Sequence, residues 1–186
     1  MKRARLALWV PLMVVSLLQT PGEKVFVATA VPGYSENQVK AAFITHLFSF
    51  IDWPTESAHY VLCATKASPL VDTLVALVEA KPALGLSVEL LAHDDVNKAS
   101  CHALILEAEA YDSEDSRRKS ESHDAHEGLL TISDAPGFAR QGGMIELERR
   151  PSRIGLVVNL PAARKAGFQV SSKLLRLATI VDGEGA

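Results

Sequence analysis

Hydrophobic and polar positions alternate along the chain in a way that predicts helices separated by strands. The first helix is expected to begin at Ser35, whose side chain can form a capping box with Gln38, and its apolar stripe continues to Phe50. Trp53-Pro54 should end this helix, because a residue that precedes proline disfavours the helical conformation. A second helix is predicted after Ser68-Pro69, with the proline in its first turn.

Six further segments have the short apolar runs that are typical of strands: residues 60–65, 86–91, 103–106, 129–133, 144–148 and 154–160. A charged helix is expected between the third and fourth of them, at about residues 113–126. Strands that first alternate with helices and then follow one another directly indicate a mixed sheet. We therefore predict an α/β fold, with a mixed sheet of about six strands covered by helices on both faces, in a single domain over residues 35–181.

The C-terminal region is predicted to be helical in two pieces. Asn159-Leu160-Pro161 should start the first piece, and Gly167 fits the position just beyond its end. Ser171 is expected to cap a second helix, whose apolar residues are Leu174, Leu175, Leu177 and Ala178. Residues 182–186 are expected to form a disordered tail.

The N-terminus has the features of a secretory signal peptide over residues 1–30. Three basic residues among the first five precede an uncharged apolar run, and Ala28-Thr29-Ala30 suits signal peptidase. The apolar run has about 13 residues, fewer than the roughly 20 that a membrane-spanning helix needs. We predict export to a bacterial periplasm. The alternative is an uncleaved N-terminal anchor.

The charge of the predicted mature chain excludes some kinds of partner. Removal of residues 1–30 changes the formal net charge from −3 to about −6. A domain of about 156 residues can bury one sizeable core. Its acidic balance argues against nucleic acid, which calls for a basic face, and against a basic membrane anchor. We expect no direct insertion into a membrane after cleavage.

Cys63 and Cys101 are the two cysteines, and both lie in the predicted mature chain. Two thiols in an oxidising compartment usually pair. A bridge between them would close a loop of about 38 residues, which the chain-entropy model values at roughly 4 kcal/mol. The alternative is two separately buried thiols, since free cysteine is among the most buried residue types.

Residues that could carry chemistry have simpler explanations. His123 and His126 could share a helix face, but they lie in a charged segment that we expect to be solvated. His93-Asp94-Asp95 has the composition of a turn, and His46 is expected to be a core or interface histidine. Gly142-Gly143 precedes a strand and lacks the spacing of a phosphate-binding loop, so backbone conformation explains it better. No nucleophile motif is present. We expect no enzymatic activity, no metal and no cofactor.

Phe138 and Arg140 lie in a short connection between two predicted strands, where residues tend to be exposed. An exposed phenylalanine beside an arginine has the composition of an interface anchor, which makes the pair a candidate for partner binding. The alternative is that Phe138 fills the core beneath its loop.

Several short motifs, in their order and spacing, resemble the periplasmic YfiR-like (HmsC-like) proteins. The resemblance extends from about Val39 to Ile180. It rests on Val39-Lys40-Ala41-Ala42-Phe43, Asp52-Trp53-Pro54, Cys101-His102, Leu130-Thr131-Ile132-Ser133-Asp134, Phe138, Gly142-Gly143-Met144-Ile145, Asn159, Ala162-Ala163, Ala166-Gly167 and Ser171 to Ala178.

This resemblance implies an α/β domain, often dimeric, that binds the periplasmic portion of an inner-membrane diguanylate cyclase and represses it. Cyclic-di-GMP synthesis and biofilm output would then be low until the inhibition is relieved. Cys63 and Cys101 fall where the family's disulfide lies, whereas a second cysteine pair is absent around residues 138–144. The alternative function is a periplasmic small-ligand binding module associated with an outer-membrane receptor. A ligand binder should have a large apolar pocket, and a regulator should have an exposed apolar patch.

Overall fold

The computed structural model describes residues 33–91, 100–108 and 127–182. The first half contains α1 (Glu36–Leu47), β1 (Ile51–Asp52), β2 (Tyr60–Ala64), α2 (Pro69–Glu79), the 3-10 helix η1 (Pro82–Leu84), β3 (Leu86–Leu90) and β4 (Ala103–Leu106). The second half contains β5 (Leu130–Ser133), the 3-10 helix η2 (Phe138–Gln141), β6 (Ile145–Arg150), β7 (Arg153–Asn159), α5 (Leu160–Lys165), β8 (Gln169–Val170), α6 (Ser172–Leu175) and β9 (Ala178–Val181). The predicted signal peptide, the helix at 113–126 and the last four residues lie outside these ranges.

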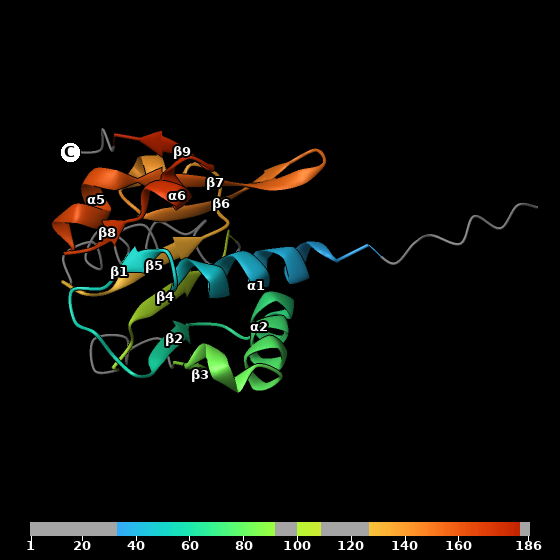
Figure 1. The fold of residues 1–186 in the computed structure, drawn as a ribbon. Coiled ribbons are helices and arrows are strands. Elements are labelled where there is room, and N and C mark those ends of the chain that lie inside the picture. Colours follow the sequence, from blue (N-terminus) through green and yellow to red (C-terminus); the bar gives the residue numbers. More distant parts are fainter. Residues whose placement is uncertain (1–32, 92–99, 109–126, 183–186) are drawn as a thin grey trace, which may run out of the picture. The chain divides into compact units, whose positions relative to one another are not determined.

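The fold is α/β and is built on a mixed seven-stranded sheet. Its strands and helices are labelled in Figure 1. The strand order of the sheet is β3-β2-β4-β5-β6-β7-β9. Neighbouring strands are parallel throughout, except that β6 and β7 form an antiparallel hairpin. A separate two-stranded ribbon pairs β1 with β8. The prediction of a mixed sheet in one domain is therefore confirmed, with seven strands in the main sheet instead of about six.

The seventh strand corrects the predicted C-terminal helix. Ser171 caps a helix as expected, but α6 ends at Leu175 and Ala178–Val181 form β9. β9 pairs with β7 in parallel, with Leu156 opposite Ala178 and Val158 opposite Ile180. A one-turn helix gains little from its own hydrogen bonds, whereas the edge of β7 offers a full ladder. Tertiary pairing therefore overrides the helical pattern at Leu177 and Ala178.

The first helix begins as predicted and ends earlier. The Ser35–Gln38 capping box is present, with the Ser35 hydroxyl accepting from the Gln38 N–H at 3.2 Å. The helix stops at Leu47 and a short turn leads into β1. The Trp53 indole N–H donates to the Phe48 carbonyl at 3.3 Å, and the two rings stack with centroids 4.9 Å apart. These contacts cap the C-terminal end of α1, so the helix already ends ahead of Pro54.

The main core lies on one face of the sheet, where α1, α2, α5 and α6 all contribute buried side chains. Leu62 and Ala64 of β2 point to this face, while Cys63 between them belongs to a smaller cluster with Leu104. This alternation is the period of two expected of a strand. The 3-10 helix η2 packs on the second face, where Ala139 joins a cluster with β7 and β9.

Candidate functional site

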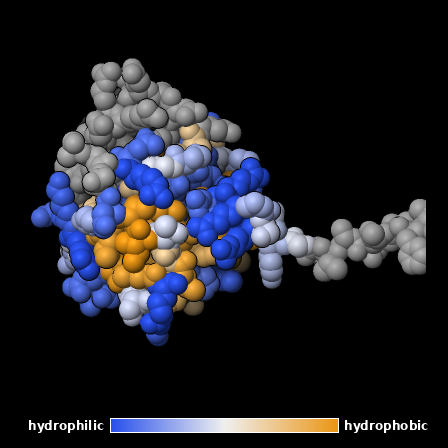
Figure 2. All heavy atoms as spheres, turned by 90° about the horizontal axis from the view of Figure 1, so that it is seen from above, coloured by the Kyte–Doolittle hydropathy of each residue, from blue (hydrophilic) through white to orange (hydrophobic). Residues whose placement is uncertain are grey.

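A large apolar groove lies between the outer sides of α1, α2 and α6. We call it the apolar groove, and its volume is about 760 Å³. The residues that line it are Tyr34, Gln38, Val39, Ala42, Phe43, His46, Leu47, Phe50, Thr73, Ala76, Leu77, Ala80, Lys81, Leu174 and Leu177. The volume falls within the range of about 300–1,000 Å³ that small-molecule sites occupy. The face seen in Figure 2 carries one continuous hydrophobic area that hydrophilic residues surround.

The groove arises because the apolar stripe of α1 is wider than its contact with the sheet. Ala41, Ile44 and Leu47 are buried in the core. Val39 and Phe43, on the adjoining side of the helix, remain partly accessible. Alanines on α1 and α2 leave space between the two helices, since a methyl group fills little of it. The described part of the chain thus leaves a hydrophobic helix side open to solvent.

The exposed rim of the groove is hydrophobic as well. Tyr34 is 86% exposed and Leu177 is 79% exposed. Large apolar side chains at such exposure, next to a contiguous apolar surface, mark sites of interaction. The basic residues that line the groove are His46 and Lys81, and no carboxylate lines it.

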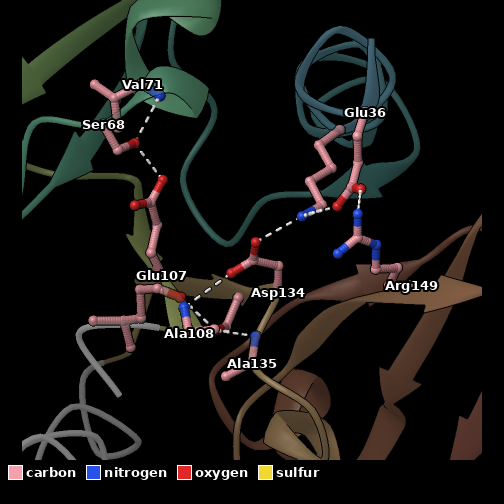
Figure 3. A network of polar contacts seen from close by, with 11 residues as sticks. Glu36, Ser68, Val71, Glu107, Ala108, Asp134, Ala135 and Arg149 are labelled. Carbon is pink, nitrogen blue, oxygen red and sulfur yellow. Dashed lines mark hydrogen bonds and ion pairs between the residues drawn. The ribbon is translucent and has the colours of Figure 1, made fainter. Parts of the chain in front are cut away.

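A polar network around Lys40 of α1 includes Glu36, Asp134 and Arg149, and Figure 3 labels these three partners. The Lys40 side chain is buried, and its ammonium group lies 2.7 Å from a carboxylate oxygen of Glu36 and 2.7 Å from one of Asp134. Arg149 of β6 contacts the other oxygen of Glu36. The network therefore joins the first turn of α1 to the end of β5 and to the β6–β7 hairpin.

The pairing sets the protonation of this network. Burial alone would lower the pKa of Lys40, but the hydrogen bonds to Asp134 and Glu36 outweigh it, and the pKa is raised. The hydrogen bond from Lys40 lowers the pKa of Glu36. Both groups are thus held in their charged forms, which suits a structural clamp and not proton transfer.

The network continues to the carboxyl ends of the parallel strands. The Ala108 N–H donates to Asp134 at 2.9 Å, and the Ala135 N–H donates to the Ser133 hydroxyl at 3.0 Å. The Ser68 hydroxyl accepts from the Val71 N–H at 3.1 Å and donates to Glu107. A polar cavity of about 320 Å³ lies beside them, between the ends of β2 and β4.

Strand order reverses between β2 and β4, so this edge is the topological switch point of the parallel sheet. Open α/β sheets often bind ligands there. In this chain the serine and carboxylate groups around the cavity hydrogen-bond to one another and to backbone amides. They tie α1, α2 and three strand ends together, which is a structural role. The sequence motifs include Lys40 and Asp134 but assign neither a role; the i, i+4 spacing of Glu36 and Lys40 was the available signal for their pairing.

The structure places Phe138 in the interior, so the expectation of an exposed ring is wrong. Its side chain is fully buried on η2, as the loop-filling alternative predicts. The backbone turns sharply at Gly142, where φ is 105°, and the ring lies against Gly143. A connection between strands is exposed as a rule, but here the ring is held over the sheet by a tight turn on each side. Arg140 is exposed on the same 3-10 helix, and its contact with a partner stays a prediction.

Cys63 and Cys101 form the predicted disulfide, with their Cα atoms 5.8 Å apart. Cys63 is fully buried on β2 and Cys101 is half-buried just before β4. His102, next along the chain, accepts a hydrogen bond from the Val61 N–H at 3.0 Å. Burial lowers its pKa, with a smaller contribution from His59. The bridge and this histidine bond fix β4 to β2.

The remaining sequence predictions concern histidines, metal binding and membrane insertion. His46 is exposed on α1 and lines the apolar groove, so it is not a core residue. No group of three or more potential metal-binding side chains occurs in the described part of the chain. His93-Asp94-Asp95, His123 and His126 lie outside it. Within the same ranges, no helix has the length and hydrophobicity required to cross a bilayer.

Comparison with known proteins identifies the family of this chain. No curated protein matches its sequence. A family model described as YfiR/HmsC-like matches residues 37–179, which is more than half of the chain. The match begins in the first turn of α1 and ends within β9, so it spans the helices that form the groove and every strand of the sheet. The chain belongs to the YfiR/HmsC-like family.

Proposed function

We propose that this protein is a periplasmic regulator that binds and represses an inner-membrane diguanylate cyclase, and so controls cyclic-di-GMP and biofilm output. Membership of the YfiR/HmsC-like family supports the class of function. The observation that carries the proposal is the apolar groove with its exposed rim at Tyr34 and Leu177. A regulator acts by covering a partner's surface, and it needs a hydrophobic area that water leaves on binding.

The proposal assigns the groove and its rim to the periplasmic portion of the cyclase. Interfaces concentrate their binding energy in a few buried aromatic and large apolar side chains. Tyr34 and Leu177 fit that description once a partner covers them. The exposed Arg140 is a second, separate candidate for contact, as the sequence predicts. A signal peptide over residues 1–30 would bring the domain to the compartment where the partner's sensor portion lies.

In this role the protein would act without catalysis. The charged side chains of the Lys40 network are paired with one another, and the serine beside it caps a helix. A serine nucleophile is typically activated by a histidine base, whereas the Ser68 hydroxyl donates to a carboxylate, Glu107. Binding energy at an apolar surface is therefore the means by which this domain would act.

The test is binding of the mature protein to the purified periplasmic portion of the cyclase, measured by calorimetry. Leu177→Glu puts a charge into the rim and should weaken binding at least about tenfold, equivalent to about 1.4 kcal/mol. Leu90→Glu is the matched control, because Leu90 is also exposed but lies on β3, outside the groove lining. Thermal unfolding of both variants should match wild type. Equal binding by wild type and Leu177→Glu would reject the assignment of the groove to the partner.

A further inference from the structure

The apolar groove is lined by basic but not by acidic side chains, which limits the kinds of molecule that can bind there. Its lining is mostly hydrocarbon, and its basic residues are His46 on α1 and Lys81, two residues beyond the end of α2. No Asp or Glu lines it, although acidic residues outnumber basic ones by 22 to 19 in the whole chain. An occupant with a long apolar part and one negative charge complements this surface.

The few neutral polar groups of the lining are largely used inside the protein. The Thr73 hydroxyl donates to the Pro69 carbonyl at 2.6 Å within its own helix. The Gln38 side-chain oxygen accepts from the Ser35 N–H at 2.8 Å in the capping box. An extended peptide in the groove would leave its backbone N–H and C=O groups without partners, which is costly. An alkyl chain has no such groups.

We propose that the apolar groove binds a free long-chain fatty acid. The alkyl chain lies between α1 and α2 against Phe43, Ala76 and Leu77, and the carboxylate pairs with Lys81. The groove's volume of about 760 Å³ is in the range that a single ligand of this kind requires. Hydrocarbon burial supplies most of the affinity, because each CH₂ group removed from water adds to it. Lys81 selects the acid over a neutral lipid.

Occupancy of the groove has a consequence for regulation, which rests on the proposed function. The fatty acid and the cyclase would compete for the same surface, since both need the apolar side chains that line the groove. A rise in free fatty acid would then displace the regulator and release the cyclase. The lipid would serve as the releasing signal.

The binding experiment uses cis-parinaric acid, a naturally fluorescent long-chain fatty acid, titrated into the mature protein at low ionic strength. Wild type should enhance its fluorescence and saturate at one equivalent, and palmitate should displace it. Ala76→Trp fills the groove at an exposed helix position and should abolish the enhancement. Lys81→Glu should weaken binding about tenfold, whereas Lys165→Glu, at the exposed end of α5 outside the lining, should not. Added salt should weaken wild-type binding, because the ion pair is exposed.

Each result decides the proposal. Unchanged binding in Ala76→Trp, or equal affinity in Lys81→Glu and Lys165→Glu, would overturn it, provided that circular dichroism shows all three variants folded. Displacement of the probe by the corresponding fatty alcohol as readily as by palmitate would also overturn it, as would displacement by lysophosphatidylglycerol alone. A final titration of the cyclase with and without palmitate separates the two proposals. If the cyclase does not bind the lipid-free protein, the proposed function fails while the fatty-acid site stands.

Discussion

Removal of the Phe138 ring should destabilise the fold by far more than its loop position suggests. The side chain is fully buried, although it lies on a four-residue 3-10 helix between two strands. Truncation of a buried phenylalanine to alanine costs about 3–5 kcal/mol. In a domain of about 150 residues each kcal/mol lowers the melting temperature by roughly 2–4 °C, so Phe138→Ala should melt about 6–20 °C lower.

The neighbouring glycine permits a sharper form of this test. A Cβ atom on Gly143 would lie 2.2 Å from the Phe138 ring, well inside van der Waals contact. Gly143→Ala alone should therefore cost about 1–3 kcal/mol through overpacking. In the Phe138→Ala background the added methyl group has room, and its cost should fall. The two variants should show a coupling energy of about 0.5–3 kcal/mol in a double-mutant cycle.

The assay is reversible urea unfolding of wild type, both single variants and the double variant, followed by circular dichroism. Arg140→Ala is the control, because this exposed residue of the same 3-10 helix should change stability by less than about 0.5 kcal/mol. The reasoning would be refuted by a Phe138→Ala loss below about 1 kcal/mol, or by strictly additive effects of the two substitutions. A stable Phe138→Ala variant that no longer represses the cyclase would restore the interface interpretation of this residue.

Three further predictions concern the Lys40 network and the disulfide. Lys40→Met should lower the free energy of unfolding at neutral pH by about 1–3 kcal/mol, because Asp134 loses its buried partner. The Arg149 side chain is 77% exposed, so Arg149→Ala should lower it by at most about 1 kcal/mol in the same denaturation assay. The lowered pKa of Glu36 stabilises the fold above the ordinary carboxyl pKa of about 4.3, and this stabilisation is lost as the pH falls through the folded-state pKa of Glu36. The raised pKa of Lys40 stabilises the fold at lower pH, and this stabilisation is lost as the pH rises through the folded-state pKa of Lys40. Stability measured against pH should flatten at both ends in Lys40→Met, and unchanged limbs would contradict the network. Reduction, or Cys101→Ala with Cys63→Ala, should cost roughly 4 kcal/mol for a bridge across 38 residues, and two titratable thiols in unfolded, unreduced protein would show that the bridge does not form.

Features determined by local sequence were predictable in this chain. The capping box at Ser35, the proline in the first turn of α2 and the apolar runs of β2 and β4 depend on neighbours within a few residues. Helix caps and strand runs carry their own signals, so these elements lie within a few residues of their predicted bounds.

Features that depend on distant partners were not predictable. β9 forms because β7 offers an edge; its β-branched residues Thr179, Ile180 and Val181 favour a strand, but a run of four residues does not reveal its partner. Burial of Lys40 requires Asp134, which is 94 residues away in sequence. Phe138 is buried because its ring meets a glycine that the sequence identifies only as a backbone feature. The groove was missed for a related reason: the apolar stripe of α1 does not show which of its positions the rest of the fold covers, and only the arrangement of α2 and α6 reveals which side is open.

The central claim, that the domain represses a diguanylate cyclase through the apolar groove, is tested most directly by cellular cyclic-di-GMP. The measurement compares a strain that lacks this protein with the same strain supplied with wild type, Leu177→Glu or the control Leu90→Glu, at matched protein levels. The account predicts a high nucleotide level in the deletion strain and in Leu177→Glu, and a low level with wild type and Leu90→Glu. A deletion strain with an unchanged level would contradict the regulatory function, and full repression by Leu177→Glu would contradict the role of the groove.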